Sequence, residues 1–253
     1  MDVYGKTHIG KVRQLNEDSI FISSETIGDY DNLFAIADGM GGHNAGEIAS
    51  SLAVESFAAY LKEKLSVNKE QGLIDGVSYA NKVIYEKSIL NTAFKGMGTT
   101  LVACSIEVDD DGMIYIANVG DSRLYILGET LDQITVDHSY VEDLVRAGEI
   151  TREESLTHPE RNIITRALGT SELVKIDMFI LKKTGVKKIF FCSDGLTNMV
   201  PDIEIETILK MSISSEEAIE KLVSYALEAG GIDNITGTLI NIEKANEEVV
   251  PTC

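Results

Sequence analysis

The most constraining feature of this sequence is an apolar run that ends in an aspartate, which occurs three times. Asp38, Asp121 and Asp194 end such runs and are followed by glycine or serine, in LFAIADG, IYIANVGDS and KIFFCSDG. Short runs rich in Ile, Val, Phe and Tyr predict β-strands, so this pattern places carboxylates at strand ends. A single Asp-Gly pair would predict only a hairpin turn, and we expect nothing more of Asp111-Gly112.

Other segments predict further strands together with amphipathic helices. The strand-like runs cover residues 33–37, 100–108, 113–119, 123–127, 188–192 and 235–242. Apolar residues recur at helical spacing over 44–65, where Asn44 and Glu47 suit a capping box, over about 69–94, and after Ser214. The helices fall mainly in two blocks, which indicates antiparallel sheets covered by helices rather than a regular βαβ alternation.

The segment from 138 to about 169 differs from the rest of the chain. It has few large apolar residues and two helix starts, Ser139 with Glu142 and Thr151 with Glu154. This pattern predicts a surface insertion outside the core.

Composition bounds the partners and the compartment. The 253 residues are 44% hydrophobic, enough for a proper core, and carry a formal net charge of −19. That charge repels nucleic acid and anionic lipid, so we expect neither nucleic acid nor a membrane as partner. No signal peptide or membrane-spanning run is evident, and Cys104 and Cys192 lie in apolar runs, so we expect a reducing cytoplasm. The acidic surface and the lack of a coiled-coil pattern favour a monomer.

Acidic residues spread along the chain form a set of hard oxygen donors, the ligands that Mg²⁺, Mn²⁺ and Ca²⁺ prefer. The set, next to Asn16, is Glu17, Asp18, Asp38, Asp121, Asp194 and Asp233. If these groups converge, they cannot all stay ionised without a counter-charge, which divalent cations would supply. Zinc is disfavoured because the sequence has no cluster of histidine and cysteine.

Two other phosphate-binding chemistries fit poorly. Residues 39–42 follow a strand and open a helix, as in a dinucleotide-binding loop, but Asn44 occupies the position of the third glycine. A cysteine-based phosphatase needs an arginine shortly after its cysteine, and neither Cys104 nor Cys192 has one at the required position. Any phosphatase chemistry here must therefore be metal-based.

Two basic residues beside the acidic positions could act on a phosphate. Arg13 shortly precedes the acidic pair Glu17-Asp18, and its planar guanidinium could hold two phosphate oxygens. His43 follows the glycine-rich turn, where it could protonate a leaving group. The simpler alternatives are a surface arginine and a surface or capping histidine.

Taken in order, these segments carry a specific resemblance. From about residue 4 to residue 242 the chain resembles the protein phosphatase 2C (PP2C, or PPM) family. The shared motifs are RQLNED at 13–18, DGMGGH at 38–43, GTT at 98–100, VGDSR at 119–123, SDGL at 193–196 and GIDNIT at 231–236. One departure is Gly237, where an apolar β-branched residue is usual and glycine would weaken the strand or permit a bulge.

The resemblance implies an α+β fold, a four-layer α–β–β–α sandwich of two packed antiparallel sheets with helices outside. The segment at about 138–170 is similar to the flap of the bacterial members, which implies a bacterial stand-alone enzyme. We expect one catalytic domain over residues 1–243 and a C-terminal tail over 244–253.

The resemblance also implies a metal centre with two core ions, Mn²⁺ or Mg²⁺. Asp38 would bridge both ions, and Gly39 would offer its backbone carbonyl. Asp194 and Asp233 would complete the site of the first ion.

Further residues would complete this centre. Glu17 and Asp18 would support the second ion, partly through water, and Asp121 would join Asp194 around a third, weaker ion. Arg13 would bind the phosphate, and His43 would be the general acid.

The implied function is hydrolysis of phosphoserine and phosphothreonine in proteins by a metal-bridging water, without a phosphoenzyme. A bacterial Ser/Thr protein kinase and its substrates are the implied partners. Two rivals remain: a catalytically dead module that binds phosphoproteins, and a phosphatase for small metabolites, which the same site would allow. The first predicts a damaged ligand set, whereas every expected carboxylate is present.

Overall fold

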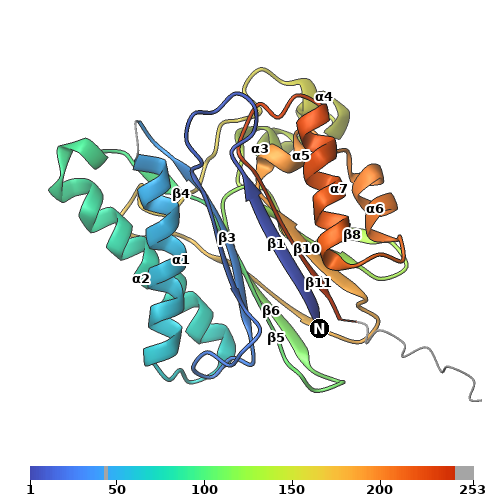
Figure 1. The fold of residues 1–253 in the computed structure, drawn as a ribbon. Coiled ribbons are helices and arrows are strands. Elements are labelled where there is room, and N and C mark those ends of the chain that lie inside the picture. Colours follow the sequence, from blue (N-terminus) through green and yellow to red (C-terminus); the bar gives the residue numbers. More distant parts are fainter. Residues whose placement is uncertain (43–44, 243–253) are drawn as a thin grey trace, which may run out of the picture.

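The computed structural model describes residues 1–42 and 45–242, in which two antiparallel sheets lie face to face (Figure 1). One sheet has the order β1-β11-β10-β7-β8, with strands Asp2–His8, Ile235–Asn241, Lys188–Cys192, Arg123–Leu127 and Leu131–Gln133. The other has the order β2-β3-β5-β6-β9, with strands Asp18–Ser23, Leu33–Met40, Leu101–Ile106, Met113–Val119 and Asp177–Lys182. The short β4 (Gly98–Thr99) pairs with β3.

Helices cover the outer face of each sheet. On the side of β3 they are α1 (Ala45–Glu63) and α2 (Lys69–Leu90), followed by the short η1 (Thr92–Phe94). On the side of β11 they are α5 (Asp194–Thr197), α6 (Asp202–Leu209) and α7 (Ser215–Glu228). The expected α–β–β–α sandwich is confirmed. None of the helices in the described part of the chain is long and apolar enough to cross a membrane.

Strand β3 has an unbroken apolar sequence because both of its faces are buried. Phe34 and Ile36 pack between the two sheets, whereas Leu33, Ala35 and Ala37 pack against the helices. Successive side chains of a strand point to opposite faces, so burial of both faces removes the usual polar alternation.

The two cysteines in apolar runs are also in the core. Cys104 packs between the sheets and Cys192 packs against the helices, and both are free thiols. Strand β11 continues through Gly237, which pairs with Lys6 and with Cys192. A Cβ on Gly237 would lie 3.3 Å from Leu196 Cδ1 and 3.4 Å from Ile219 Cδ1, so the glycine makes room for helix packing instead of forming a bulge.

The antiparallel register brings acidic residues to one end of the sandwich, at the top of Figure 1. Asp18, the first residue of β2, lies opposite Asp38 near the end of β3. Strand β6 runs parallel to β3, because both pair antiparallel with β5, so Asp121 follows β6 at the same end. Asp194 follows β10, and Asp233 precedes the antiparallel β11.

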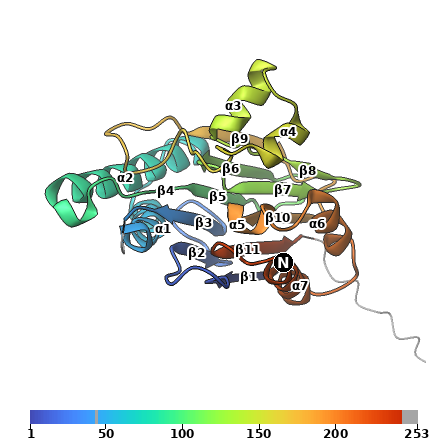
Figure 2. The same ribbon diagram turned by 90° about the horizontal axis from the view of Figure 1, so that it is seen from above.

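The expected insertion carries α3 (Tyr140–Ala147) and α4 (Arg152–Thr157), which stand off the sandwich in Figure 2. We call residues 138–170 the flap. Its last residues rejoin the body, where Leu168 is fully buried and exchanges backbone hydrogen bonds of 2.9 and 3.1 Å with Thr99. The expectation of a surface segment therefore holds for most of α3 and α4, whereas both ends of the flap are buried, at His138 and Ser139 and at Ala167 and Leu168.

Candidate metal centre

Asp38 lies among carboxylates from both sheets. Burial raises the pKa of Asp38 well above its usual range, and the charges of Asp18, Asp194, Asp121 and Asp233 raise it further. Burial and then Asp233 raise the pKa of Asp194, while burial and then Asp194 raise that of Asp121. The five groups therefore share one electrostatic environment, which we call the carboxylate cluster.

Asp18 is held in the interior by two hydroxyl groups. Ser193 Oγ donates to Asp18 Oδ2 at 2.8 Å, and Thr236 Oγ1 donates to the same oxygen at 2.6 Å. Burial raises the pKa of Asp18 to about 7, although both hydrogen bonds lower it. Asp18 is thus fixed through one oxygen, while its other oxygen is left for another partner.

Several oxygens of the site lack that partner. Glu17 Oε1, Asp18 Oδ1 and Asp121 Oδ1 are buried and accept no hydrogen bond from any described residue. Buried carboxylate oxygens are normally hydrogen-bonded or bound to a cation, so this donor set fits a hard divalent cation. Among the described residues, no three acidic, histidine or cysteine side chains form a ready-made metal-binding group.

Glycines bring Glu17 close to the start of α1. The Gly39 N–H donates to the Glu17 carbonyl at 2.9 Å. A Cβ on Gly39 would lie 2.0 Å from the Gly46 carbonyl oxygen, and one on Gly46 would lie 2.3 Å from Glu17 Oε1. Only glycine fits at these two positions, which explains part of the DGMGG motif.

Arg13 reaches the same end of the sandwich from the loop after β1. Its guanidinium lies 2.9 Å from Asp233 Oδ2 and 3.4 Å from Glu17 Oε2, and 46% of the side chain is exposed. The Asn234 side chain fastens this loop: it donates to the carbonyls of Ile9 and Leu15 at 2.9 Å and accepts from the Glu17 N–H at 2.8 Å.

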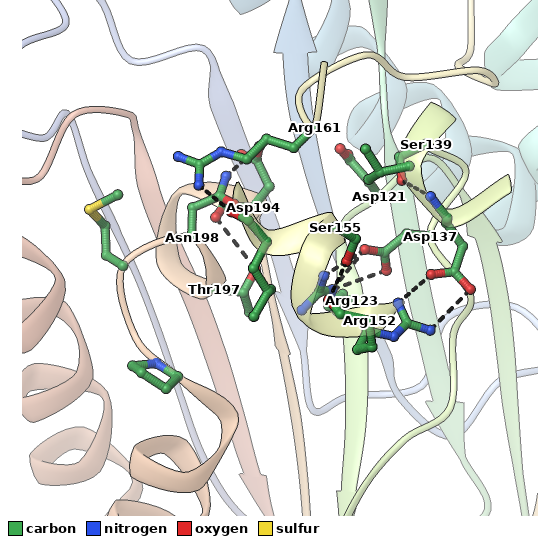
Figure 3. Close-up of a pocket in the computed structure, with 15 residues that line it drawn as sticks. Asp121, Arg123, Asp137, Ser139, Arg152, Ser155, Arg161, Asp194, Thr197 and Asn198 are labelled. Carbon is green, nitrogen blue, oxygen red and sulfur yellow. Dashed lines mark hydrogen bonds and ion pairs between the residues drawn. The ribbon is translucent and has the colours of Figure 1, made fainter. Parts of the chain in front are cut away.

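A cavity of about 230 Å³ separates the flap from α5 (Figure 3). Asp121 and Asp194 line it from the sandwich, and Arg161 lines it from the flap. The Arg161 guanidinium donates to the Leu156 carbonyl at 2.7 Å and lies over Asn198 and Asp194 in this view. The site is therefore open to a molecule that enters beneath the flap.

The comparison with known families agrees with this geometry. The sequence profile described as protein phosphatase 2C matches residues 4–229. The chain belongs to the protein phosphatase 2C family. The resemblance predicted from the motifs is confirmed, and with it the expectation of a protein phosphatase.

Bacterial members of PP2C are similar over nearly the whole chain. The serine/threonine phosphatase Stp of Listeria welshimeri is 40% identical over 242 residues, 93% of each chain. The phosphatase PhpP of Streptococcus pneumoniae is 34% identical, over 98% of this chain and all of the relative. The crystal structure of Stp1 from Staphylococcus aureus has a TM-score of 0.88 and 36% identity, and covers 96% of both chains.

The PP2C fold brings together all the described residues predicted for the site. They are Arg13, Glu17, Asp18, Asp38, Gly39, Asp121, Asp194 and Asp233. His43, the predicted general acid, lies outside the described residues. The individual roles of these eight residues and of His43 stay predictions.

Some supporting residues were missed. Ser193, Thr236 and Asn234 stand inside the recognised motifs, but a hydroxyl or an amide indicates no role until its distant partner is known. Asn198, which donates to Asp194 Oδ2 at 3.0 Å, had no sequence signal.

Proposed function

We propose that this PP2C member hydrolyses phosphoserine and phosphothreonine esters in proteins and uses Mn²⁺ or Mg²⁺ to do so. The observation that carries the proposal is the carboxylate cluster, with buried oxygens that accept no hydrogen bond from the residues that the structure describes. The names of the bacterial relatives, which are serine/threonine phosphatases, support the substrate class. Hard cations suit this all-oxygen donor set better than zinc.

We assign two core ions and a weaker third ion to the cluster. Asp38, Gly39, Asp194 and Asp233 would hold the first ion, and Asp38 with Glu17 and Asp18 the second. Asp121 and Asp194 would hold the third. When bound, such ions lower the pKa of a coordinated water and neutralise phosphoryl oxygens.

The protein's own groups bind and orient the substrate. Arg13 is exposed and already paired with carboxylates, so an arriving phosphate would replace Asp233 and Glu17 as its partners. Asn234 holds the backbone on both sides of Arg13 and thereby aims the guanidinium. His43 would donate a proton to the departing serine or threonine oxygen.

Wider assignments follow from the same proposal. A Ser/Thr kinase that phosphorylates the same proteins would be the functional counterpart. The family match over residues 4–229 supports one catalytic domain over residues 1–243, with the flap as part of it. Two free, buried thiols suit the reducing cytoplasm, and we expect a monomer.

The test is hydrolysis of a phosphothreonine peptide by metal-stripped protein, before and after Mn²⁺ or Mg²⁺ is added. Asp38→Asn and Asp194→Asn should abolish the restored activity. Asp110→Asn is the matched control, because Asp110 is exposed in the β5–β6 turn at the opposite end of the sandwich. The control should keep full activity.

Other outcomes would redirect the proposal. A folded, metal-loaded protein without activity would indicate a phosphoprotein-binding module. Faster turnover of sugar phosphates than of phosphopeptides would indicate a metabolite phosphatase. A His43→Ala variant that slows peptide and activated aryl phosphates equally would contradict the general-acid assignment, since an aryl leaving group needs little protonation.

A further inference from the structure

The flap joins the body of the protein through a narrow stem. Its outgoing arm begins at His138 and its returning arm passes through Arg166. The Tyr140 N–H donates to the Ile163 carbonyl at 2.8 Å, and the Thr165 N–H donates to the His138 carbonyl at 2.8 Å. His138 is therefore the residue at which the two arms meet the sandwich.

His138 holds Gly120 at both polar groups of its backbone. The His138 N–H donates to the Gly120 carbonyl at 3.0 Å, and His138 Nδ1 accepts from the Gly120 N–H at 2.9 Å. Gly120 has a φ of +112°, and a Cβ there would lie 2.5 Å from a Thr100 side-chain atom. The turn that precedes Asp121 thus has a backbone conformation that suits only glycine, and the backbone and imidazole of His138 hold it in place.

The other side of the imidazole faces Asp177 on β9. His138 Nε2 lies 3.1 Å from Asp177 Oδ2 and 2.7 Å from the Arg166 guanidinium, and Arg166 donates to Asp177 Oδ1 at 2.8 Å. Because Nδ1 accepts a hydrogen bond, the proton of the neutral ring is assigned to Nε2, which donates to Asp177. Asp177 thereby receives one hydrogen bond from each arm of the stem.

Asp121 depends on this turn for its position. Its side chain is buried, and Oδ1 accepts no hydrogen bond from any residue in the described part of the chain. On its other side, Ser122 Oγ and Thr100 Oγ1 form a buried hydrogen bond of 2.7 Å. The position of the Asp121 carboxylate is therefore set by the backbone, which is held by hydrogen bonds at Gly120 on one side and at Ser122 on the other.

We propose that His138 is a positioning residue that fixes the Gly120–Asp121 turn and couples it to the flap stem. Movement of the stem would shift Asp121 through Gly120, and a cation held by Asp121 would in turn favour the hydrogen-bonded stem described here, since such coupling is reciprocal. The inference rests on the proposed role of Asp121 as a ligand of the weaker third ion. It gives the flap a direct mechanical connection to the metal centre.

Two nearly isosteric substitutions test the contacts of Nδ1 and of Nε2 separately. His138→Asn keeps an oxygen near the position of Nδ1, so it can still accept from Gly120, but it loses the donor to Asp177. His138→Gln places its amide near Nε2, so it can still reach Asp177, but it loses the acceptor for Gly120. A purely structural histidine would tolerate or reject both changes alike.

The measurement is calorimetric titration of Mn²⁺ into the metal-stripped full chain, which does not depend on activity. His138→Gln should weaken the weakest binding step by about 10–100-fold, as expected when a group that orients a ligand is lost. Asp121→Asn should abolish that step, and His138→Asn should leave it within a few-fold of the unsubstituted protein. Thermal unfolding in Mn²⁺ verifies that each variant is folded.

The outcomes separate this inference from the proposed function. If Asp121→Asn leaves all binding steps intact, the third-ion assignment is wrong and the inference loses its basis. If Asp121→Asn removes a step but His138→Gln and His138→Asn behave alike, the positioning role is wrong and the metal assignment stands.

Hydrogen exchange on the unsubstituted protein tests the same coupling if a variant does not fold. Filling the weakest Mn²⁺ site should slow exchange at the amides of Gly120, Tyr140 and Thr165. Unchanged exchange at all three amides would overturn the coupling.

Discussion

Asp18 and Asp38 lie directly opposite each other in the antiparallel register of β2 and β3. Like charges at facing positions of a ladder are destabilising. After burial, the Asp18 charge is the largest cause that raises the pKa of Asp38. The protein therefore keeps an unfavourable arrangement at one end of its sandwich, which is reasonable if a cation compensates it.

The first prediction concerns stability against pH without metal. The pKa of Asp18 is raised to about 7 by burial, so the folded state binds a proton that the unfolded state does not. Such a group stabilises the fold below its unfolded pKa, and this contribution is lost as the pH rises through 7. In EDTA we expect the free energy of unfolding to increase by about 1 kcal/mol as the pH falls from about 8 to 6.5.

Thermal unfolding in EDTA measures this slope, with Asp18→Asn as the control that should reduce it. The window stops at about pH 6.5 because burial lowers the pKa of His138, whose protonation acts in the opposite direction below that pH. Stability that falls over the same interval would contradict the raised carboxyl pKa values.

The second prediction is that Asp38→Asn stabilises the metal-free protein but reduces its stabilisation by metal. Asp38→Asn removes one of the repelling charges, so the metal-free protein should become more stable, with a melting temperature about 2–4 °C higher for each kcal/mol gained. The same substitution removes a ligand, so the increase in melting temperature on adding Mn²⁺ should shrink. Unfolding scans in EDTA and in Mn²⁺ measure both effects. A variant destabilised in both conditions would show that Asp38 contributes packing instead of repulsion.

The parts of this site that could be predicted from the sequence are those whose signal lies within one short stretch of the chain. The run LFAIAD carries its own information, because a strand buried on both faces must be apolar throughout and its aspartate must then lie at the end. Convergence of the aspartates could be inferred from their number and chemistry. The contact of Arg13 with Asp233 could not, because it joins residues 220 positions apart through the pairing of β1 with β11.

Two of the elements that were missed, β1 and α5, have weak local patterns. Strand β1 is an edge strand in which Lys6 is half-exposed and Thr7 exposed, so it lacks an apolar run. Helix α5 has a single turn, too short for any periodicity. The strands predicted from apolar runs were all found, and Asp111-Gly112 forms only the turn between β5 and β6.

The third prediction tests the hydroxyl support of Asp18. Thr236→Val keeps the β-branched shape but removes the donor at 2.6 Å from Asp18 Oδ2. We expect Mn²⁺ affinity to fall by about 10–100-fold, because groups that orient a ligand commonly have effects of this size. Thr238→Val on the same strand is the matched control, since Thr238 Oγ1 is buried with no hydrogen-bond partner among the described residues.

The control should bind Mn²⁺ normally and be at least as stable as the unsubstituted protein. Calorimetric titration gives the affinities. Equal affinities for the two valine variants would mean that the Thr236 hydroxyl does not support the site.

The fourth prediction concerns Asn234, which is buried and makes three hydrogen bonds to the loop that carries Arg13. Asn234→Ala leaves the carbonyls of Ile9 and Leu15 without their donor, at a cost of about 1–3 kcal/mol for each buried group that water cannot reach. The loop should then move, so that Arg13 meets the phosphate less often and KM for a phosphopeptide rises more than kcat falls. Asn234→Asp keeps the acceptor for the Glu17 N–H but adds a charge beside Asp233, so it should not rescue the loop. Hydrogen exchange of residues 9–17 distinguishes movement of the loop from a direct effect on the carboxylate cluster. We expect faster exchange with unchanged Mn²⁺ affinity. Protected amides with weakened Mn²⁺ binding would instead place Asn234 in the metal centre itself.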